Sequence, residues 1–296
     1  MLRPRQASLL ICVLLLLGMI VPCLGLSEEA EKATGEAASE KSYDDWHFVY
    51  YIAPAWLPAF SGHVTAKGKT ASVHVNYGQM LENLQFAKGA GFGHLEVKKG
   101  RWVLLVEGLY AKFSDQANVL KDIKPPIIVP IEISVAGQVK VTTAASFDET
   151  SVLYDLYRSD STIRNQPVLT VEALLGARYL YFGTSATVST LGPLAVRSVS
   201  FSKKQDWVDP IIGGRVLWNL GNRWMVGFRG DVGGFGLVSR FTLNLDAFVV
   251  YRANNWLRFV GGYRALYEDH VEGGGINKFV YDMWTYAPYV GVGVEF

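Results

Sequence analysis

Apolar and polar residues alternate along most of this chain, from Trp46 to its last residue. The final segment shows the pattern clearly, because every second residue from Pro288 to Phe296 is apolar and the residues between them are tyrosine, glycine or glutamate. Successive side chains of a strand point to opposite faces, so a period of two places the apolar set on one side of a sheet. Almost no apolar pattern at helical spacing accompanies it. The alternation therefore predicts an all-β domain.

The alternating segments predict about ten strands, with a range of roughly 8 to 12. They are 46–56, 84–97, 101–113, 134–146 or longer, 168–182, 207–220, 222–232, 239–252, 255–267 and 283–296. Tight turns such as Gly221-Asn222 join some of them. Longer connections join the others, over 57–83, 114–132, 183–206 and 268–282. Short turns at one end and longer loops at the other are typical of outer-membrane barrels, and an even strand count places both chain ends at the short-turn end.

Alternation alone does not separate a soluble barrel, with its apolar face inward, from a membrane barrel, with its apolar face outward. The tripeptide Gly-x-Arg occurs at 176–178, 213–215, 227–229 and 262–264. In each case glycine and arginine share a face, and we expect the glycine to leave room for the arginine inside a narrow lumen. Tryptophan and tyrosine gather near the predicted strand ends, where aromatic girdles meet the lipid–water boundaries. These features predict a closed antiparallel transmembrane β-barrel, because lipid does not tolerate unpaired strand edges.

The N-terminus has the three parts of a secretory signal. Arg3 and Arg5 precede an apolar run over 9–21, and small or turn-forming residues follow at 22–25. We therefore expect three segments: a signal peptide over 1–25, a flexible acidic linker over 26–45 and the barrel domain over 46–296. Both cysteines, Cys12 and Cys23, would leave with the signal.

Two alternatives exist for this N-terminal segment. An uncleaved anchor helix is disfavoured because the apolar run is short for a bilayer. A lipoprotein acylated at Cys23 is disfavoured because Pro22 comes directly before that cysteine.

The composition excludes several classes of protein. The chain has 296 residues, 28 Lys and Arg against 27 Asp and Glu, 13% aromatic residues and 30 glycines. A nucleic-acid-binding protein shows a clear excess of basic residues, and a disordered chain contains fewer aromatic residues. A polytopic helical membrane protein needs several apolar runs of about 20 residues, whereas the only long run here is the N-terminal one. We expect no nucleic-acid partner.

Three motifs give the chain a resemblance to a known group. Residues 206–215 (DWVDPIIGGR) resemble a W-x-D-P-hydrophobic-x-G-x-R strand, residues 230–236 (GDVGGFG) resemble a G-D-x-G-G-F-G turn, and residues 262–264 match a G-Y-R strand. In these motifs the chain resembles a family of Gram-negative outer-membrane β-barrel proteins of uncharacterised activity, which implies a porin-like barrel. The specific part of the resemblance is 206–264, and the first half of the chain agrees more loosely.

The resemblance implies a place and a set of partners. It implies a monomer in the bacterial outer membrane, surrounded by lipid and lipopolysaccharide and delivered by periplasmic chaperones. The terminal Phe296 is similar to the assembly signal that the barrel-assembly machinery recognises in such proteins.

The sequence contains no obvious site for chemistry. Residues 89–93 (GAGFG) superficially resemble a phosphate-binding loop, but no helix pattern follows them. The five histidines, His47, His63, His74, His94 and His270, lack the spacing of metal ligands. An outer-membrane lipid-modifying hydrolase would need a serine or an acid within about 2.6–3.2 Å of His63 or His270. We expect no cofactor, no bound metal and no enzymatic activity.

Charged residues on the lumen side of the predicted strands carry the main functional hypothesis. They are Arg178, Arg215, Arg229, Arg264, Glu107, Glu172, Asp209, Asp231, Asp246 and Glu295. Opposite signs at close quarters predict ion pairs that fill the barrel, which favours a structural or surface-binding role. A narrow channel for small solutes or ions is the alternative, since about ten strands lie between filled eight-stranded barrels and open porins of about 16.

Overall fold

The structure is a computed structural model that describes residues 43–56, 58–66, 69–78, 91–119, 137–164, 166–191 and 196–296. The expected signal peptide and nearly all of the expected linker lie outside the described residues. Residues 42–296 form one unit. Within the described ranges, no helix is long and apolar enough to cross a membrane.

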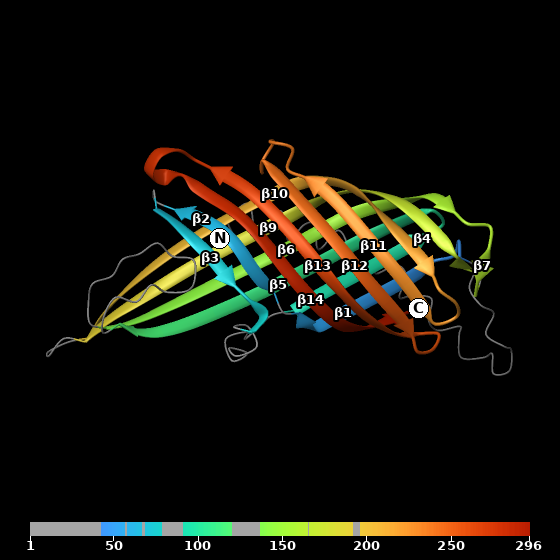
Figure 1. Ribbon diagram of the computed structural model, residues 1–296, viewed down its shortest axis with the longest axis horizontal. Coiled ribbons are helices and arrows are strands. Elements are labelled where there is room, and N and C mark those ends of the chain that lie inside the picture. The colour runs from blue at the N-terminus through green and yellow to red at the C-terminus, as the bar shows by residue number, and fades with distance from the viewer. Residues whose placement is uncertain are drawn as a thin grey trace, which may run out of the picture. The chain divides into compact units, whose positions relative to one another are not determined.

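Ten antiparallel strands form a closed ring (Figure 1). In ring order they are β1 (His47–Trp56), β4 (Gly91–Lys99), β5 (Trp102–Val119), β6 (Gly137–Arg158), β9 (Leu169–Leu191), β10 (Val196–Asn219), β11 (Trp224–Gly233), β12 (Phe241–Arg252), β13 (Leu257–Glu272) and β14 (Phe279–Glu295). The ring closes because β1 pairs with β14 as well as with β4. The prediction of a closed antiparallel barrel of about ten strands is confirmed.

One further hairpin joins the sheet in the segment that the sequence assigns to a long connection. Strand β2 (Ala59–Ala66) pairs with the first half of β14, β1 pairs with the second half of β14, and β3 (Lys69–Val75) pairs with β2. β1 and β2 therefore lie one after the other along the same edge of β14. The two-residue strands β7 (Thr162–Ile163) and β8 (Gln166–Pro167) form a small hairpin between β6 and β9, and a short 3-10 turn, η3 (Gly275–Asn277), lies between β13 and β14.

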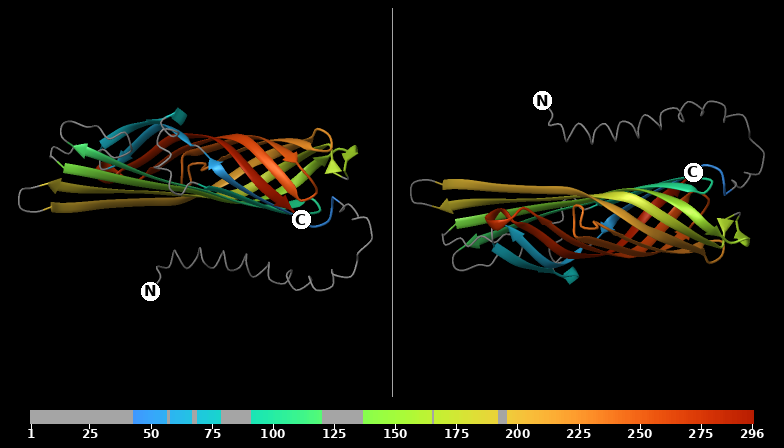
Figure 2. Two further views of the ribbon diagram at one scale, coloured as in Figure 1. Left: turned by 90° about the horizontal axis from the view of Figure 1, so that it is seen from below. Right: turned by 90° about the horizontal axis from the view of Figure 1, so that it is seen from above.

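Several predicted connections are strands. β5, β6, β9 and β10 have 18, 22, 23 and 24 residues. The predicted connection over 183–206 was therefore wrong at 183–191 and 196–206, and the one over 114–132 was wrong at 114–119; the rest of both lies outside the described residues. Figure 2 shows these strands extending past the rest of the barrel wall. The outer parts of β9 and β10, 183–191 and 196–206, are rich in serine and threonine, so the apolar alternation fades although the backbone ladder continues. Likewise, β13 ends at Glu272 and β14 begins at Phe279, which shortens the predicted 268–282 loop.

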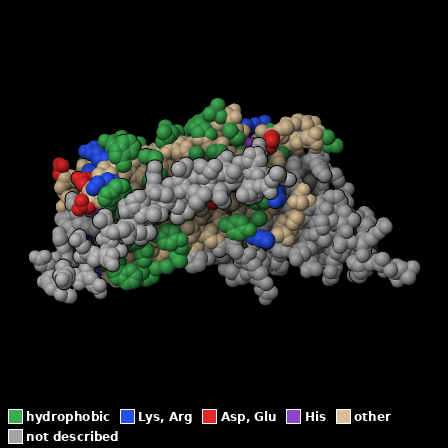
Figure 3. Space-filling model, turned by 180° about the vertical axis from the view of Figure 1, so that it is seen from behind, with side chains coloured by type: hydrophobic (Ala, Val, Ile, Leu, Met, Phe, Trp, Pro, Cys, Tyr) green, Lys and Arg blue, Asp and Glu red, His purple; other side chains and the backbone are tan. Residues whose placement is uncertain are grey.

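Apolar residues of the barrel lie on its outer surface and charged residues lie inside, the reverse of the arrangement in a soluble protein. Leu175, Val290 and Trp218 are 67%, 61% and 55% exposed on the outer wall, whereas Glu172 and Arg229 inside are 1% and 2% exposed. Figure 3 shows the hydrophobic side chains gathered on the outer surface. Among the β10 side chains that the structure describes, the exposed apolar ones lie within 208–218, which matches the 9–11 residues or so that a tilted strand needs to cross a bilayer. The outer wall therefore faces lipid.

An aromatic girdle marks one boundary of this lipid-facing band. Five exposed tryptophans lie at or next to the short-turn ends of the strands: Trp46, Trp102, Trp218, Trp224 and Trp256. Indole rings favour the lipid–water boundary because one edge is polar. The short-turn end of the lumen therefore lies at one membrane interface.

Candidate functional site

A network of ion pairs fills the middle of the lumen. Arg229, on β11, donates from Nη1 to Glu107 Oε2 at 3.2 Å and from Nη2 to Asp231 Oδ2 at 2.9 Å. The same Nη2 also donates to Glu149 on β6. All four residues are at most 5% exposed. One guanidinium thus ties three carboxylates from three strands across the centre of the barrel.

Two further arginines extend this network around the wall. Arg178, on β9, donates to Asp231 Oδ1 at 2.6 Å and to Glu149 Oε2 at 3.0 Å. Arg264, on β13, donates to Glu107 Oε2 at 2.9 Å and to Asp246 Oδ2 at 3.1 Å. Buried charges are stable only when they are paired and hydrogen-bonded. We name Glu107, Glu149, Arg178, Arg229, Asp231, Asp246 and Arg264 the central network.

A second layer lies on the short-turn side of the central network. Arg215 donates from Nε to Glu172 Oε2 at 2.5 Å and from Nη2 to Glu96 Oε2 at 3.2 Å. His94 connects the two layers, because its two ring nitrogens lie 2.7 Å from Glu96 Oε1 and 2.7 Å from Glu107 Oε1. Opposite charges therefore continue along the lumen.

The structure brings most of the sequence-predicted lumen charges into these two layers. Nine of them are at most 7% exposed. Glu295 instead lies half-buried at the short-turn end, paired with Arg258. Asp209 is buried apart from the central network and holds a turn. Sequence reasoning missed His94, Glu96 and Glu149. Their spacing along β4 and β6 places them on the inner face, but nothing in the sequence distinguishes them from other polar residues.

The glycines of the Gly-x-Arg tripeptides lie close to groups of neighbouring strands. A Cβ at Gly227 would collide with the Phe248 ring of β12, and a Cβ at Gly262 would collide with the Tyr289 ring of β14. At Gly213 the nearest atoms belong to the backbone of β11. The glycines therefore admit groups from neighbouring strands, and the expectation that they leave room for the arginine stays a prediction.

Two of the sequence motifs meet at the other end of the lumen. The N–H of Gly234 donates to Pro210 O at 3.1 Å, and both the N–H and the hydroxyl of Ser239 donate to Asp209, at 2.9 and 2.6 Å. Gly234 and Gly236 have φ values of +77° and +71°, where a side chain would be strained. The W-x-D-P strand thus anchors the turn formed by the G-D-x-G-G-F-G segment.

A serine, a histidine and an aspartate come together in this anchor. Ser239 Oγ lies 3.2 Å from His270 Nδ1, and the His270 ring stacks on Trp207 with 4.1 Å between ring centroids. In a hydrolase triad the histidine lies between serine and aspartate, whereas here the serine lies between the other two. Ser239 is 0% exposed. His63, the other histidine considered from the sequence, is exposed on β2.

Apolar side chains fill the lumen beyond the anchor. This cluster includes Leu109, Phe147, Leu180, Phe182, Trp207, Phe279, Tyr281 and Met283. These eight residues come from five strands of the ring, β5, β6, β9, β10 and β14. The lumen is therefore filled by charge pairs in its middle and by apolar packing towards the long-strand end.

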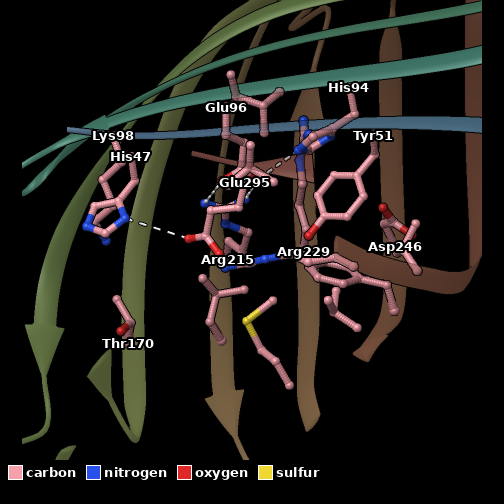
Figure 4. A pocket seen from close by; sticks show the side chains of 18 of the residues that line it. His47, Tyr51, His94, Glu96, Lys98, Thr170, Arg215, Arg229, Asp246 and Glu295 are labelled. Carbon is pink, nitrogen blue, oxygen red and sulfur yellow. Dashed lines mark hydrogen bonds and ion pairs between the residues drawn. The ribbon is translucent and has the colours of Figure 1, made fainter. Parts of the chain in front are cut away.

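The short-turn half of the lumen is hollow by contrast. A cavity of about 110 Å³ reaches from His47, Lys98 and Glu295 down to Arg229 and Asp246 (Figure 4). His47 Nδ1 lies 3.6 Å from Glu295 Oε1 at the mouth. The central network forms the floor of the cavity.

Tyr43 covers one side of the mouth. Its ring lies 4.6 Å from the Arg158 guanidinium and 3.7 Å from Lys98 Nζ. Its hydroxyl accepts a hydrogen bond from Lys98 and lies 3.4 Å from Thr170 Oγ1. Burial raises the pKa of the Tyr43 hydroxyl well above its usual range, so this group stays neutral at physiological pH.

Comparisons with known proteins add little to this geometry. No protein-family model and no curated protein matches the chain. The attachment invasion locus protein Ail of Yersinia pestis is similar at a TM-score of 0.32 and 9% identity, over 85% of this chain and 99% of Ail. Neisserial surface protein A is similar at 0.28 and 13%, over 88% of this chain and 100% of its own. The toluene transporter TodX of P. putida is similar at 0.30 and 10%, over 85% and 90%.

TM-scores this low carry no argument about activity. The location of the protein in the outer membrane follows from its own geometry. It combines a closed antiparallel ring, a lipid-facing apolar wall and a charged interior. That combination is the architecture of bacterial outer-membrane proteins. The chain is an outer-membrane β-barrel.

Proposed function

We propose that this protein is a closed, non-catalytic outer-membrane barrel that presents an extended sheet for binding at the cell surface. The central network carries the proposal. Three arginines and four carboxylates, contributed by six strands, hydrogen-bond to one another across the lumen. Breaking such buried pairs costs about 3–5 kcal/mol each, so solutes would meet a stable barrier. The network favours a structural or binding role over a narrow channel.

The long strands supply the binding surface. If 208–218 of β10 crosses the membrane, 196–207 extends beyond it, a path of about 40 Å at about 3.3 Å per residue. Ser202, Lys204 and Asp206 on this part are exposed, and a polar outer face suits water rather than lipid. Outer-membrane barrels place their longer connections on the extracellular side. The β9–β10 hairpin is thus expected to stand outside the cell.

Cysteine labelling on intact cells tests this arrangement. Lys204→Cys places a thiol on the long-strand side and Asn222→Cys places one in the short β10–β11 turn, and both native residues are exposed. A membrane-impermeant maleimide should label the first variant on intact cells and the second only after lysis. Labelling of Asn222→Cys on intact cells, with Lys204→Cys protected, would contradict the proposal.

An outer-membrane hydrolase is the second candidate, because Ser239 and His270 lie within 3.2 Å. The full burial of Ser239 and its bonds to Asp209 favour the structural role. A fluorophosphonate probe distinguishes the two. The structural role predicts no covalent labelling and no phospholipid hydrolysis, whereas labelling that disappears in Ser239→Ala would establish the hydrolase.

A further inference from the structure

The basic side chains that line the short-turn cavity are unequally paired. Lys98 lies 3.2 Å from Asp155, Arg215 is held by Glu172 and Glu96, and Arg258 pairs with Glu295. Arg229 belongs to the central network. Arg252 is the exception, since no carboxylate of the described part of the chain forms an ion pair with it.

Neutral groups hold Arg252 in place. Its Nη2 donates to Gln166 Oε1 at 2.7 Å and to Asn219 Oδ1 at 2.8 Å, and Nη2 lies 3.7 Å from Met225 Sδ. Asn219 is itself fixed by a bond from its Nδ2 to Pro167 O at 2.7 Å. Arg252 is 6% exposed, and its buried Nε has no hydrogen-bond partner within the described residues. The guanidinium is oriented and buried but not neutralised.

A second arginine stands directly opposite. Arg252 and Arg258 are register partners on β12 and β13, both buried on the inner face. Like charges directly opposite each other on neighbouring strands destabilise a sheet, and among the described residues the only carboxylate that forms an ion pair with either arginine is Glu295. Within this part of the chain two guanidiniums therefore share one carboxylate, which leaves one positive charge without compensation.

The wall beside these arginines is apolar. Leu217, Met225, Phe248, Val250 and Val260 line the cavity from β10, β11, β12 and β13. A ligand site commonly combines such a wall with a few polar groups that fix orientation. The single uncompensated charge selects a monoanion, and a carboxylate suits a guanidinium because it accepts two parallel hydrogen bonds.

We propose that Arg252 and Arg258 bind the carboxylate of an amphipathic monocarboxylic acid that enters from the short-turn end. The apolar body of the ligand packs against the wall formed by β10–β13, and the central network stops it from passing further. This site is independent of the sheet at the long-strand end, and so its test does not depend on the proposed surface role.

Decanoate binding to the full-length mature protein in lipid nanodiscs tests the proposal. We expect saturable binding by calorimetry, with an affinity at least about tenfold weaker in Arg252→Gln, because a charged hydrogen-bond pair is lost. Arg223→Gln is the matched control, since Arg223 is an exposed arginine at the same end of the barrel. This control should bind like the wild type. No saturable binding, or equal binding by Arg252→Gln, would overturn the site.

Two further ligands test the contributions of the carboxylate and of the apolar body separately. Decanol lacks the charge and inorganic phosphate lacks the apolar body, so neither should show binding that depends on Arg252. Saturable decanol binding that Arg252→Gln weakens as much as it weakens decanoate binding, or competition by millimolar phosphate equal to that by decanoate, would refute the assignment of an amphipathic monocarboxylate.

Thermal unfolding of the wild-type protein supplies a readout that needs no variant. Decanoate should raise the Tm and decanol should not, because only the anion compensates the buried charge. Conversely, ligand-free Arg252→Gln should be at least as stable as the wild type, since the substitution removes an uncompensated charge. Equal Tm shifts with both ligands, or a strongly destabilised Arg252→Gln, would count against the proposal.

Discussion

Arg229 and Glu107 meet across the lumen, with 3.2 Å between Nη1 and Oε2, although three strands of the ring separate β11 from β5. This contact spans the barrel rather than joining neighbours in the sheet. It places a positive charge among three carboxylates at the point where a channel would need open space.

Removing Arg229 should destabilise the barrel strongly. Arg229→Met leaves Glu107, Glu149 and Asp231 with less positive charge in a buried setting, which costs about 3–5 kcal/mol. Urea unfolding in detergent micelles, followed by tryptophan fluorescence, measures the loss. Exposed Arg223→Met should change the free energy of unfolding by no more than about 0.5 kcal/mol. Equal stability of the two variants would contradict a structural network.

Gly213 should not tolerate a side chain. A Cβ there would collide with the backbone of β11 at Gly230 and Asp231, so Gly213→Ala forces two strands apart and should cost about 1–3 kcal/mol. Gly230→Ala is the control, because its Cβ would meet only side-chain carbons at 3.5 and 3.9 Å. The same urea titration compares them, and a larger loss in Gly230→Ala would refute the packing argument.

The bond from Ser239 to Asp209 should hold the turn over 233–240. Asp209→Ala removes two hydrogen bonds from a buried site, a loss of about 1–3 kcal/mol where the donors remain unpaired. Limited proteolysis should then cut this turn faster, with the cleavage position read by mass spectrometry. Asp206→Ala serves as the control, because Asp206 lies on the exposed outer face of the same strand. An unchanged rate of cleavage at this turn in Asp209→Ala would contradict the proposed role of Asp209 as its anchor.

Phe296 should matter for assembly more than for stability. Its ring is 63% exposed and stacks on Phe48 at 5.7 Å between centroids, so Phe296→Ala should refold in detergent nearly as well as the wild type. If the barrel-assembly machinery recognises this residue, the level of folded protein in the outer membrane should fall several-fold. Heat-modifiable gel mobility measures both quantities. Normal membrane levels would contradict an assembly signal.

Alternation predicted the barrel and its approximate strand number because side-chain direction is local information. Strand length was harder to predict. Between Gly183 and Asp206 the chain is rich in serine and threonine, so the apolar alternation stops, although 196–206 of β10 still pairs with 181–191 of β9. A backbone ladder outside the membrane needs no lipid-facing apolar residues.

The candidate sites depend on information that the alternation lacks. The period of two indicates which face carries Glu107 and Arg229, but it does not indicate that residues 122 positions apart meet across the lumen. The role of Arg252 is still harder to predict, because its distinguishing property is that no carboxylate of the described residues forms an ion pair with it. Pairing across a closed barrel depends on strand tilt and register, which only the structure shows.

Single-channel recording in planar bilayers tests the central claim of a filled lumen most directly. Folded wild-type protein, inserted at a known copy number, should show no discrete conductance steps, because the central network and the apolar cluster beyond it close the barrel. Reproducible current steps from the same preparation would contradict a filled lumen and would favour a narrow channel.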